Sequence, residues 1–172
     1  MAKGPQFERD VCRQLSLWWT GGERDDVFWR THGSGARATT RHKAGKRTAG
    51  QYGDIAASDP VGAALVRCIT FSLKRGYNRH TLHDLLDMPE KAAKQVWEKW
   101  VAEIRQTARD AGTPFWAIIA KRDRREPLII LPRRFAAQVG FSYPFQIRSI
   151  VGLQFQSFLK QVRPSEVLNL VV

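Results

Sequence analysis

The chain has 172 residues, enough for one domain with a sizeable buried core. Its two cysteines, Cys12 and Cys68, are too few for a disulfide framework and have no metal-ligand spacing. The residues at the start lack the apolar core of a signal peptide, and no apolar run approaches the roughly 18 residues of a membrane-spanning helix. These features argue against secretion and insertion, so we expect a cytoplasmic protein with reduced cysteines and no membrane contact.

The charge is strongly basic. Lys and Arg number 28 against 16 Asp and Glu, which gives a formal net charge of +12 and a pI of about 10.4. A well-solvated basic surface would account for this excess. We favour a nucleic-acid partner, because clustered cations gain free energy by displacing the counterions condensed on nucleic acid.

The first half of the chain predicts a helix followed by short strands. Apolar residues recur at helical spacing from Phe7 to Trp18, after a Gly-Pro start and before Gly21. Strands are expected at 26–31, 54–57 and 65–74, where aromatic and branched residues gather. The segment 33–53 shows no periodicity and is longer than an idle connection, which indicates a functional loop.

The second half predicts helices alternating with apolar strands. A short helical turn is expected at 81–86 and a long helix at 89–111, whose buried face carries Trp97 and Trp100. Apolar runs at 115–120 and 128–131 suit central strands, and a helix near 132–139 precedes an amphipathic stretch at 146–162. This order predicts an α/β fold in which helices flank a central mixed β-sheet. We expect one domain over 1–172, with a core of about 3–131 and a C-terminal extension at 132–172.

Three residues suggest chemistry on phosphate esters. Asp54 begins one expected strand, and Ser72 and Lys74 lie on the same face of the next, two positions apart. Hydrolysis of a phosphodiester usually needs divalent cations, and hard ions such as Mg²⁺ prefer carboxylate oxygens. A lysine beside them can stabilise charge in the transition state or orient the attacking water. The four histidines form no zinc-binding pattern.

This pattern resembles the core of the PD-(D/E)XK nucleases, which have a restriction-endonuclease-like fold. In that family an aspartate lies at the edge of one strand and an acid-x-lysine motif on the next, as in Gly53-Asp54-Ile55 and Phe71-Ser72-Leu73-Lys74 here. A glutamate on the first helix often completes the site, and Glu8 stands at that place. The resemblance implies a DNA endonuclease that uses Mg²⁺ or Mn²⁺, with Asp54 and Glu8 holding metal and Lys74 assisting catalysis.

Within that superfamily, the chain is most similar in pattern to archaeal-type Holliday junction resolvases. These proteins begin with a KG-x-x-x-E-R-like helix, matched by residues 3–9, and continue with Arg-x-x-x-Ser-Gly, matched from Arg30 to Ser34 and Gly35. The resemblance implies branched DNA as substrate and a symmetric homodimer, because a four-way junction needs two paired cuts.

Ser72 departs from the family pattern, since that position usually holds Glu or Asp. In one interpretation the acid has migrated to the following helix, as in restriction endonucleases that carry Ser-x-Lys. Asp87, with twelve residues between it and Lys74, then becomes a metal ligand, and Glu90 lies slightly further on. Asp87 and Glu90 also read as a helix capping box. Alternatively, the protein is inactive and only binds DNA, or the serine is a deliberate inactivating change.

The loop before Asp54 is the clearest candidate for binding the DNA backbone. It contains five cations and no acid, which suits phosphate contacts, although a solvated loop has the same composition. With the two resolvase-like positions, the predicted DNA-binding residues are Arg30, Ser34, Arg37, Arg41, Lys43, Lys46 and Arg47. The rival functions are a catalytically inactive nucleic-acid-binding module with the same fold and an unrelated basic RNA-associated protein.

Overall fold

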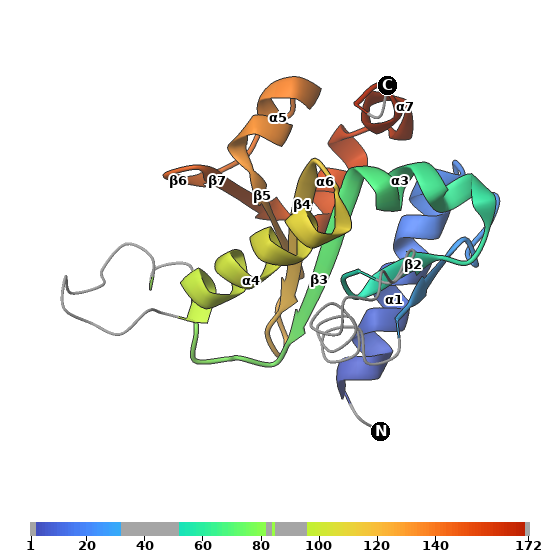
Figure 1. The fold of residues 1–172 in the computed structure, drawn as a ribbon. Coiled ribbons are helices and arrows are strands. Elements are labelled where there is room, and N and C mark those ends of the chain that lie inside the picture. Colours follow the sequence, from blue (N-terminus) through green and yellow to red (C-terminus); the bar gives the residue numbers. More distant parts are fainter. Residues whose placement is uncertain (1–2, 32–51, 82–83, 85–95, 171–172) are drawn as a thin grey trace.

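We analysed a computed structural model, which describes residues 3–31, 52–81, 84 and 96–170. These ranges contain both helices and strands, mixed along the chain (Figure 1). The N-terminal elements are α1 Lys3–Trp19, β1 Phe28–Arg30, β2 Ile55–Ala57, the 3-10 helix η1 Pro60–Gly62, α3 Ala63–Cys68 and β3 Ile69–Arg75. The remaining elements are α4 Val96–Ala111, β4 Phe115–Lys121, β5 Leu128–Pro132, α5 Arg133–Val139, β6 Phe145–Ile147, β7 Ile150–Gln154, α6 Phe155–Gln161 and α7 Pro164–Leu168.

The main sheet has five strands in the order β3-β4-β5-β7-β6. β3 and β4 run parallel, and the other neighbours are antiparallel, so the sheet is mixed. The parallel pair needs a crossover, and the connection between its strands includes α4. β1 and β2 form a separate antiparallel pair beside β3 (Figure 1). The expected α/β fold with a central mixed sheet flanked by helices is confirmed.

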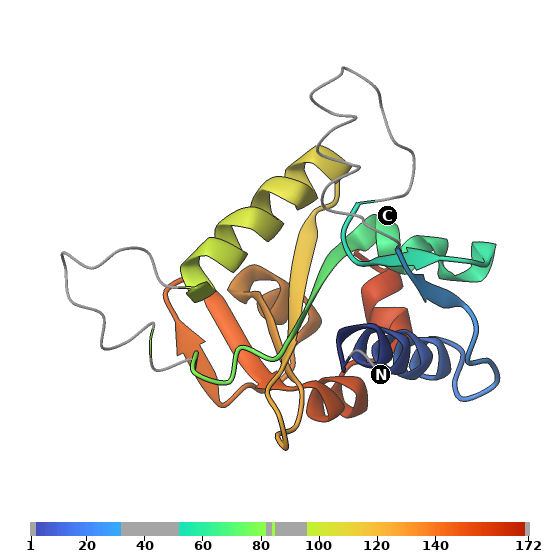
Figure 2. The ribbon, with the colours of Figure 1, turned by 90° about the horizontal axis from the view of Figure 1, so that it is seen from below.

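Alternation along the strands divides the core into two layers. Ile69, Phe71 and Leu73 of β3 pack in the cluster that also holds α1, α5 and α6. The opposite face, represented by Trp116 and Ile118 of β4, packs against the tryptophans of α4. In Figure 2, α4 lies on one side of the sheet and α1 on the other. Residues on β3 that alternate with its three core residues therefore face α4.

The prediction of a strand over 65–74 is wrong for residues 65–68 and correct for the rest. Residues 65–68 complete α3, and the strand begins at Ile69. Asp59 accepts a hydrogen bond from the Val61 N–H and caps a helical start that the proline at position 60 favours. Leu65 and Cys68 are buried at a spacing of three, which fits a helix face, and strand alternation starts only afterwards.

The C-terminal residues complete the sheet. β7 pairs with β5 along five residues, and β6 forms the edge beyond it. Phe155 and Phe158 of α6 are fully buried in the α1-side cluster. The stretch expected to be amphipathic at 146–162 therefore contains a strand and a helix. No described helix has the length and apolar character that a membrane span would need.

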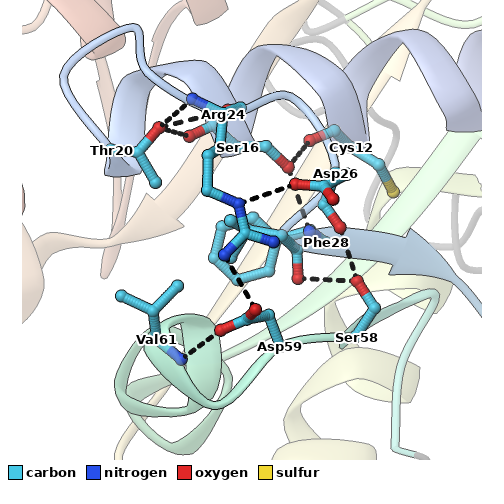
Figure 3. Close-up of polar contacts among 10 residues, drawn as sticks. Cys12, Ser16, Thr20, Arg24, Asp26, Phe28, Ser58, Asp59 and Val61 are labelled. Carbon is cyan, nitrogen blue, oxygen red and sulfur yellow. Dashed lines mark hydrogen bonds and ion pairs between the residues drawn. The ribbon is translucent and has the colours of Figure 1, made fainter.

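A polar network fixes β1 and β2 against α1 (Figure 3). The buried Ser16 hydroxyl donates to the Cys12 carbonyl at 2.8 Å and accepts from the Phe28 N–H at 2.9 Å, so both of its roles are satisfied. Arg24 pairs with Asp26 at 2.9 Å and with Asp59 at 2.8 Å. The Val61 N–H and then Arg24 lower the pKa of Asp59. These contacts position the strands that lead to Arg30 and Asp54.

Candidate active site

Asp54 is held at the free edge of β3. Its backbone N–H donates to the Phe71 carbonyl at 2.8 Å, and its Oδ2 accepts from the Leu73 N–H at 2.6 Å. The Thr31 N–H donates to the Asp54 carbonyl at 3.0 Å, which ties the same residue to the end of β1. The carboxylate therefore reaches β3 between Ser72 and Lys74, the two positions singled out by the sequence.

Gly53 makes this approach possible. Its φ is +78°, and a Cβ atom there would lie 2.5 Å from the Phe71 carbonyl oxygen and 2.9 Å from Cγ2 of Thr70. The oxygen belongs to the backbone of β3, which is paired with β4 along its length, so it cannot swing aside as a flexible side chain could. A side chain at this position would therefore push Asp54 away from β3.

We expect Gly53→Ala to lower the free energy of unfolding by about 1–3 kcal/mol more than Gly76→Ala does, the usual range for overpacking. Gly76 is a matched control because its φ is also positive, +96°, while nothing lies within 4 Å of a Cβ added there. Urea denaturation of the two variants measures the difference. Equal stabilities would contradict the tight contact between Gly53 and β3.

Ser72 and Lys74 lie on the α4 face of β3, opposite Ile118 and Ala120 of β4. The Lys74 side chain is 21% exposed, and its Nζ lies 3.7 Å from Oε2 of Glu103 on α4. The same Nζ is 5.7 Å from the centre of the Trp100 ring. The lysine is thus held between β3 and α4, beside the strand edge that Asp54 contacts.

Glu8 belongs to the opposite, α1 side. Its Oε2 lies 3.1 Å from Nη1 of Arg30, and both side chains are largely shielded from solvent. The Nε of Arg30 is buried and has no hydrogen-bond partner among the described residues. Burial is the main reason why the pKa of the Cys12 thiol is raised to about 12. The negative charges of Glu8 and Asp54 raise it further, and the positive charge of Arg30 acts in the opposite direction. The charges of Glu8, Arg30 and Asp54 therefore all act on this one buried thiol.

A metal-binding cluster is less complete than the sequence suggested. Among the residues that the structure describes, no three His, Cys, Asp or Glu side chains gather closely enough to hold an ion. Asp87, the expected replacement for the strand acid, lies outside the described residues, as does Glu90. Of the predicted DNA-binding residues, only Arg30 is described; the others, also outside, are Ser34, Arg37, Arg41, Lys43, Lys46 and Arg47.

Glu103 is the residue at this site that sequence reasoning missed. It stands three positions after Trp100, so both project toward the same side of α4, at the border of the apolar stripe. Its side chain is 66% exposed even though its carboxylate contacts Lys74. The helical periodicity of α4 places Glu103 beside Trp100. It stands well beyond the dozen or so residues after Lys74 in which the resemblance implies the displaced acid.

A mixed sheet with an aspartate fixed beside a lysine-bearing strand is the arrangement expected of a PD-(D/E)XK nuclease, with Ser72 in place of the usual strand acid. A family model described as "Phage putative PDDEXK endonuclease" matches residues 1–164, and the chain belongs to this family. The expected membership of the PD-(D/E)XK superfamily is thereby confirmed. No curated protein matches the chain significantly.

Among solved structures, the chain is similar to that of Hjc from Archaeoglobus fulgidus, a Holliday junction resolvase from an archaeal hyperthermophile. The two share 16% sequence identity, and the match covers 97% of this chain and 99% of that one with a TM-score of 0.38.

Proposed function

We propose that the protein is an endonuclease that hydrolyses DNA phosphodiester bonds with Mg²⁺ or Mn²⁺. The observation that carries this proposal is the position of Asp54, whose carboxylate is hydrogen bonded to β3 directly beside Lys74. A carboxylate and a lysine fixed on one strand edge supply a metal ligand and a positive charge at one place. Cleavage of plasmid and oligonucleotide DNA with and without Mn²⁺ tests the proposal directly.

The carboxylates present fit a hard divalent ion that is held by few protein ligands. Mg²⁺ is commonly held by one or two carboxylates, with water and substrate phosphate completing its coordination. Asp54 and Glu103 would provide these carboxylates, from either side of Lys74, and Glu103 would replace the acid missing at Ser72. Glu8 is proposed as a further carboxylate from α1. When bound, the ion would supply an activated hydroxide and neutralise charge on the phosphate.

Lys74 is proposed to stabilise the negative charge that develops on the phosphate, or to orient the attacking water. Shielding between β3 and α4 strengthens its electrostatic effect relative to an exposed lysine. Glu103 and the face of Trp100 hold its ammonium group in place before substrate arrives. The side chain thus needs little reorganisation when DNA binds.

The acid-free loop is proposed to bind the DNA backbone, although its residues lie outside the described part. We expect the fourfold replacement of Arg41, Lys43, Lys46 and Arg47 with alanine to weaken binding and to flatten its salt dependence. Each lost phosphate contact lowers the slope of log K against log salt by about 0.9 for duplex DNA. Titration at several salt concentrations measures the slope, with Arg163→Ala as control, since Arg163 is exposed and pairs with Glu166. An unchanged slope in the fourfold variant would remove the loop from the interface.

Branched DNA and a symmetric homodimer are proposed as the substrate and the assembly. The motifs at residues 3–9 and 30–35 support this choice over an arbitrary duplex. Cleavage of a four-way junction, a flap, a plain duplex and a single strand distinguishes these substrates. Sedimentation of the free protein and of its junction complex reports the number of chains.

A non-catalytic DNA-binding module is the second candidate. It is favoured by Ser72 and by the lack of a three-residue metal cluster among the described ranges. Such a module would bind the same DNA and leave every substrate intact in Mg²⁺ and Mn²⁺. Binding without cleavage would therefore replace the nuclease with this function.

A further inference from the structure

A pocket of about 380 Å³ adjoins the candidate active site on the α4 side of the sheet. It lies between the end of β3, the first turns of α4 and the turn from β4 to β5. Lys74 is part of its wall, so the pocket begins at the proposed catalytic lysine. Its volume is within the range of small-molecule sites and large enough for one nucleotide.

One wall of this pocket is strongly basic. The end of β4 and the turn to β5 contribute Lys121 and three arginines, and Glu126 is the one acidic side chain in the pocket lining. The other acid of the turn, Asp123, is engaged outside the wall, at 2.6 Å from Arg75 and 2.9 Å from Asn78. Arg124 is held at a φ of +56°, which is unfavourable for a residue with a side chain. A wall of this composition suits the phosphate of a nucleotide.

The opposite wall is aromatic. Tyr77 is 48% exposed and meets Trp100 edge-on, with ring centres 4.7 Å apart. Trp100 meets Trp97 in the same way at 4.9 Å. Tyr77 also has a positive φ, +47°, directly after Gly76. A ring anchored on a buried tryptophan with about half of its own surface exposed is a platform on which a base can stack.

Trp97 forms the buried base of the same wall. It is only 4% exposed, and its indole Nε1–H is buried without a hydrogen-bond acceptor among the described residues. Buried donors in native proteins are almost always paired, so this one calls for an acceptor beyond the described residues.

We propose that this pocket receives one unpaired nucleotide of the DNA substrate, next to the bond to be cut. The proposal rests on the proposed function, because it takes DNA as the ligand. A base within a duplex is stacked on both faces and paired at its edge, so it cannot reach the Tyr77 platform. A base in a bulge or a single-stranded flap is already free to enter. The pocket would thus let the protein recognise DNA that carries unpaired bases.

The test compares two labelled duplexes in EDTA, where no metal-dependent cleavage occurs. One carries a single-nucleotide adenine bulge, and the other carries an abasic residue at the same place, so that the two have the same backbone and differ only in the base. We expect the wild-type protein to bind the adenine bulge about tenfold more tightly in fluorescence anisotropy, a preference in the range of one base–aromatic stack.

Two variants isolate the platform. Tyr77→Ala is expected to remove the preference for adenine, and Tyr77→Phe, which keeps the ring, is expected to retain it. Equal binding of the two bulges by the wild type, or an undiminished preference in Tyr77→Ala, would overturn the proposal.

Failure of the pocket and failure of the nuclease remain separable. If the wild type cleaves DNA in Mn²⁺ but shows no preference for the adenine bulge, only the proposal for the pocket fails. A base-dependent preference without cleavage would remove the nuclease alone and leave a protein that binds unpaired nucleotides.

Discussion

Asp54→Asn is expected to lower the rate of metal-dependent DNA cleavage at least ~100-fold while leaving DNA affinity nearly unchanged. The substitution keeps the shape of the side chain and an oxygen that can accept from the Leu73 N–H, so the loop should remain on β3. It removes the negative charge that would hold the cation. A bound metal contributes several kcal/mol of transition-state stabilisation, and about 1.4 kcal/mol corresponds to a factor of ten in rate.

Single-turnover cleavage measures the rate, and anisotropy in Ca²⁺ or EDTA measures the affinity. Asp25→Asn is the control, because Asp25 is exposed, pairs with Arg13 and lies away from β3. A variant that cuts as fast as wild type would show that Asp54 only caps the strand edge through its hydrogen bond. Equal background cleavage by the wild type and the variant would instead favour the binding module.

The sequence was sufficient for most of the fold because the apolar patterns are strong. The apolar runs at residues 115–120 and 128–131 and the stripe of Trp97 and Trp100 all correspond to observed elements. The boundary between α3 and β3 was misjudged, because a short helix and a buried strand both appear as one apolar run. The pairing of the strands could not be predicted from the sequence either. β7, which pairs with β5, lies in a stretch whose sequence pattern indicates only an amphipathic segment.

The candidate site was predictable in part for a related reason. Asp54 and Lys74 belong to a motif of fixed order, and their common strand edge follows from it. Glu103 belongs to no such motif. Its contact with Lys74 depends on the angle at which α4 crosses β3, which is set by packing of the two tryptophans on the sheet. A crossing helix brings distant residues together at a spacing that the sequence alone does not specify.

Glu103 and Asp87 can be tested as rival replacements for the missing strand acid. If Glu103 holds metal, Glu103→Gln is expected to reduce cleavage at least ~100-fold and to weaken Mn²⁺ binding in calorimetry. Asp87→Asn should then change neither quantity. Glu98→Gln is the matched control, since it neutralises an acid on the same helix that pairs with Arg148 instead of Lys74. The opposite pattern, loss in Asp87→Asn alone, would assign the acid to Asp87.

The decisive variant moves the carboxylate back to the strand. Ser72 lies on the same face of β3 as Lys74, so Ser72→Glu in the Glu103→Gln background is expected to restore both Mn²⁺ binding and cleavage. Rescue follows if the cation needs a second carboxylate near Asp54 and tolerates its arrival from either β3 or α4. If Glu103 only holds Lys74 in place, an acid at position 72 should not restore cleavage in the Glu103→Gln background. In that case Mn²⁺ affinity should also be the same with and without the acid at position 72. Lys74→Ala separates the two roles further: it should reduce cleavage and leave Mn²⁺ affinity intact or raised, because removal of a neighbouring cation favours metal binding by Asp54 and Glu103.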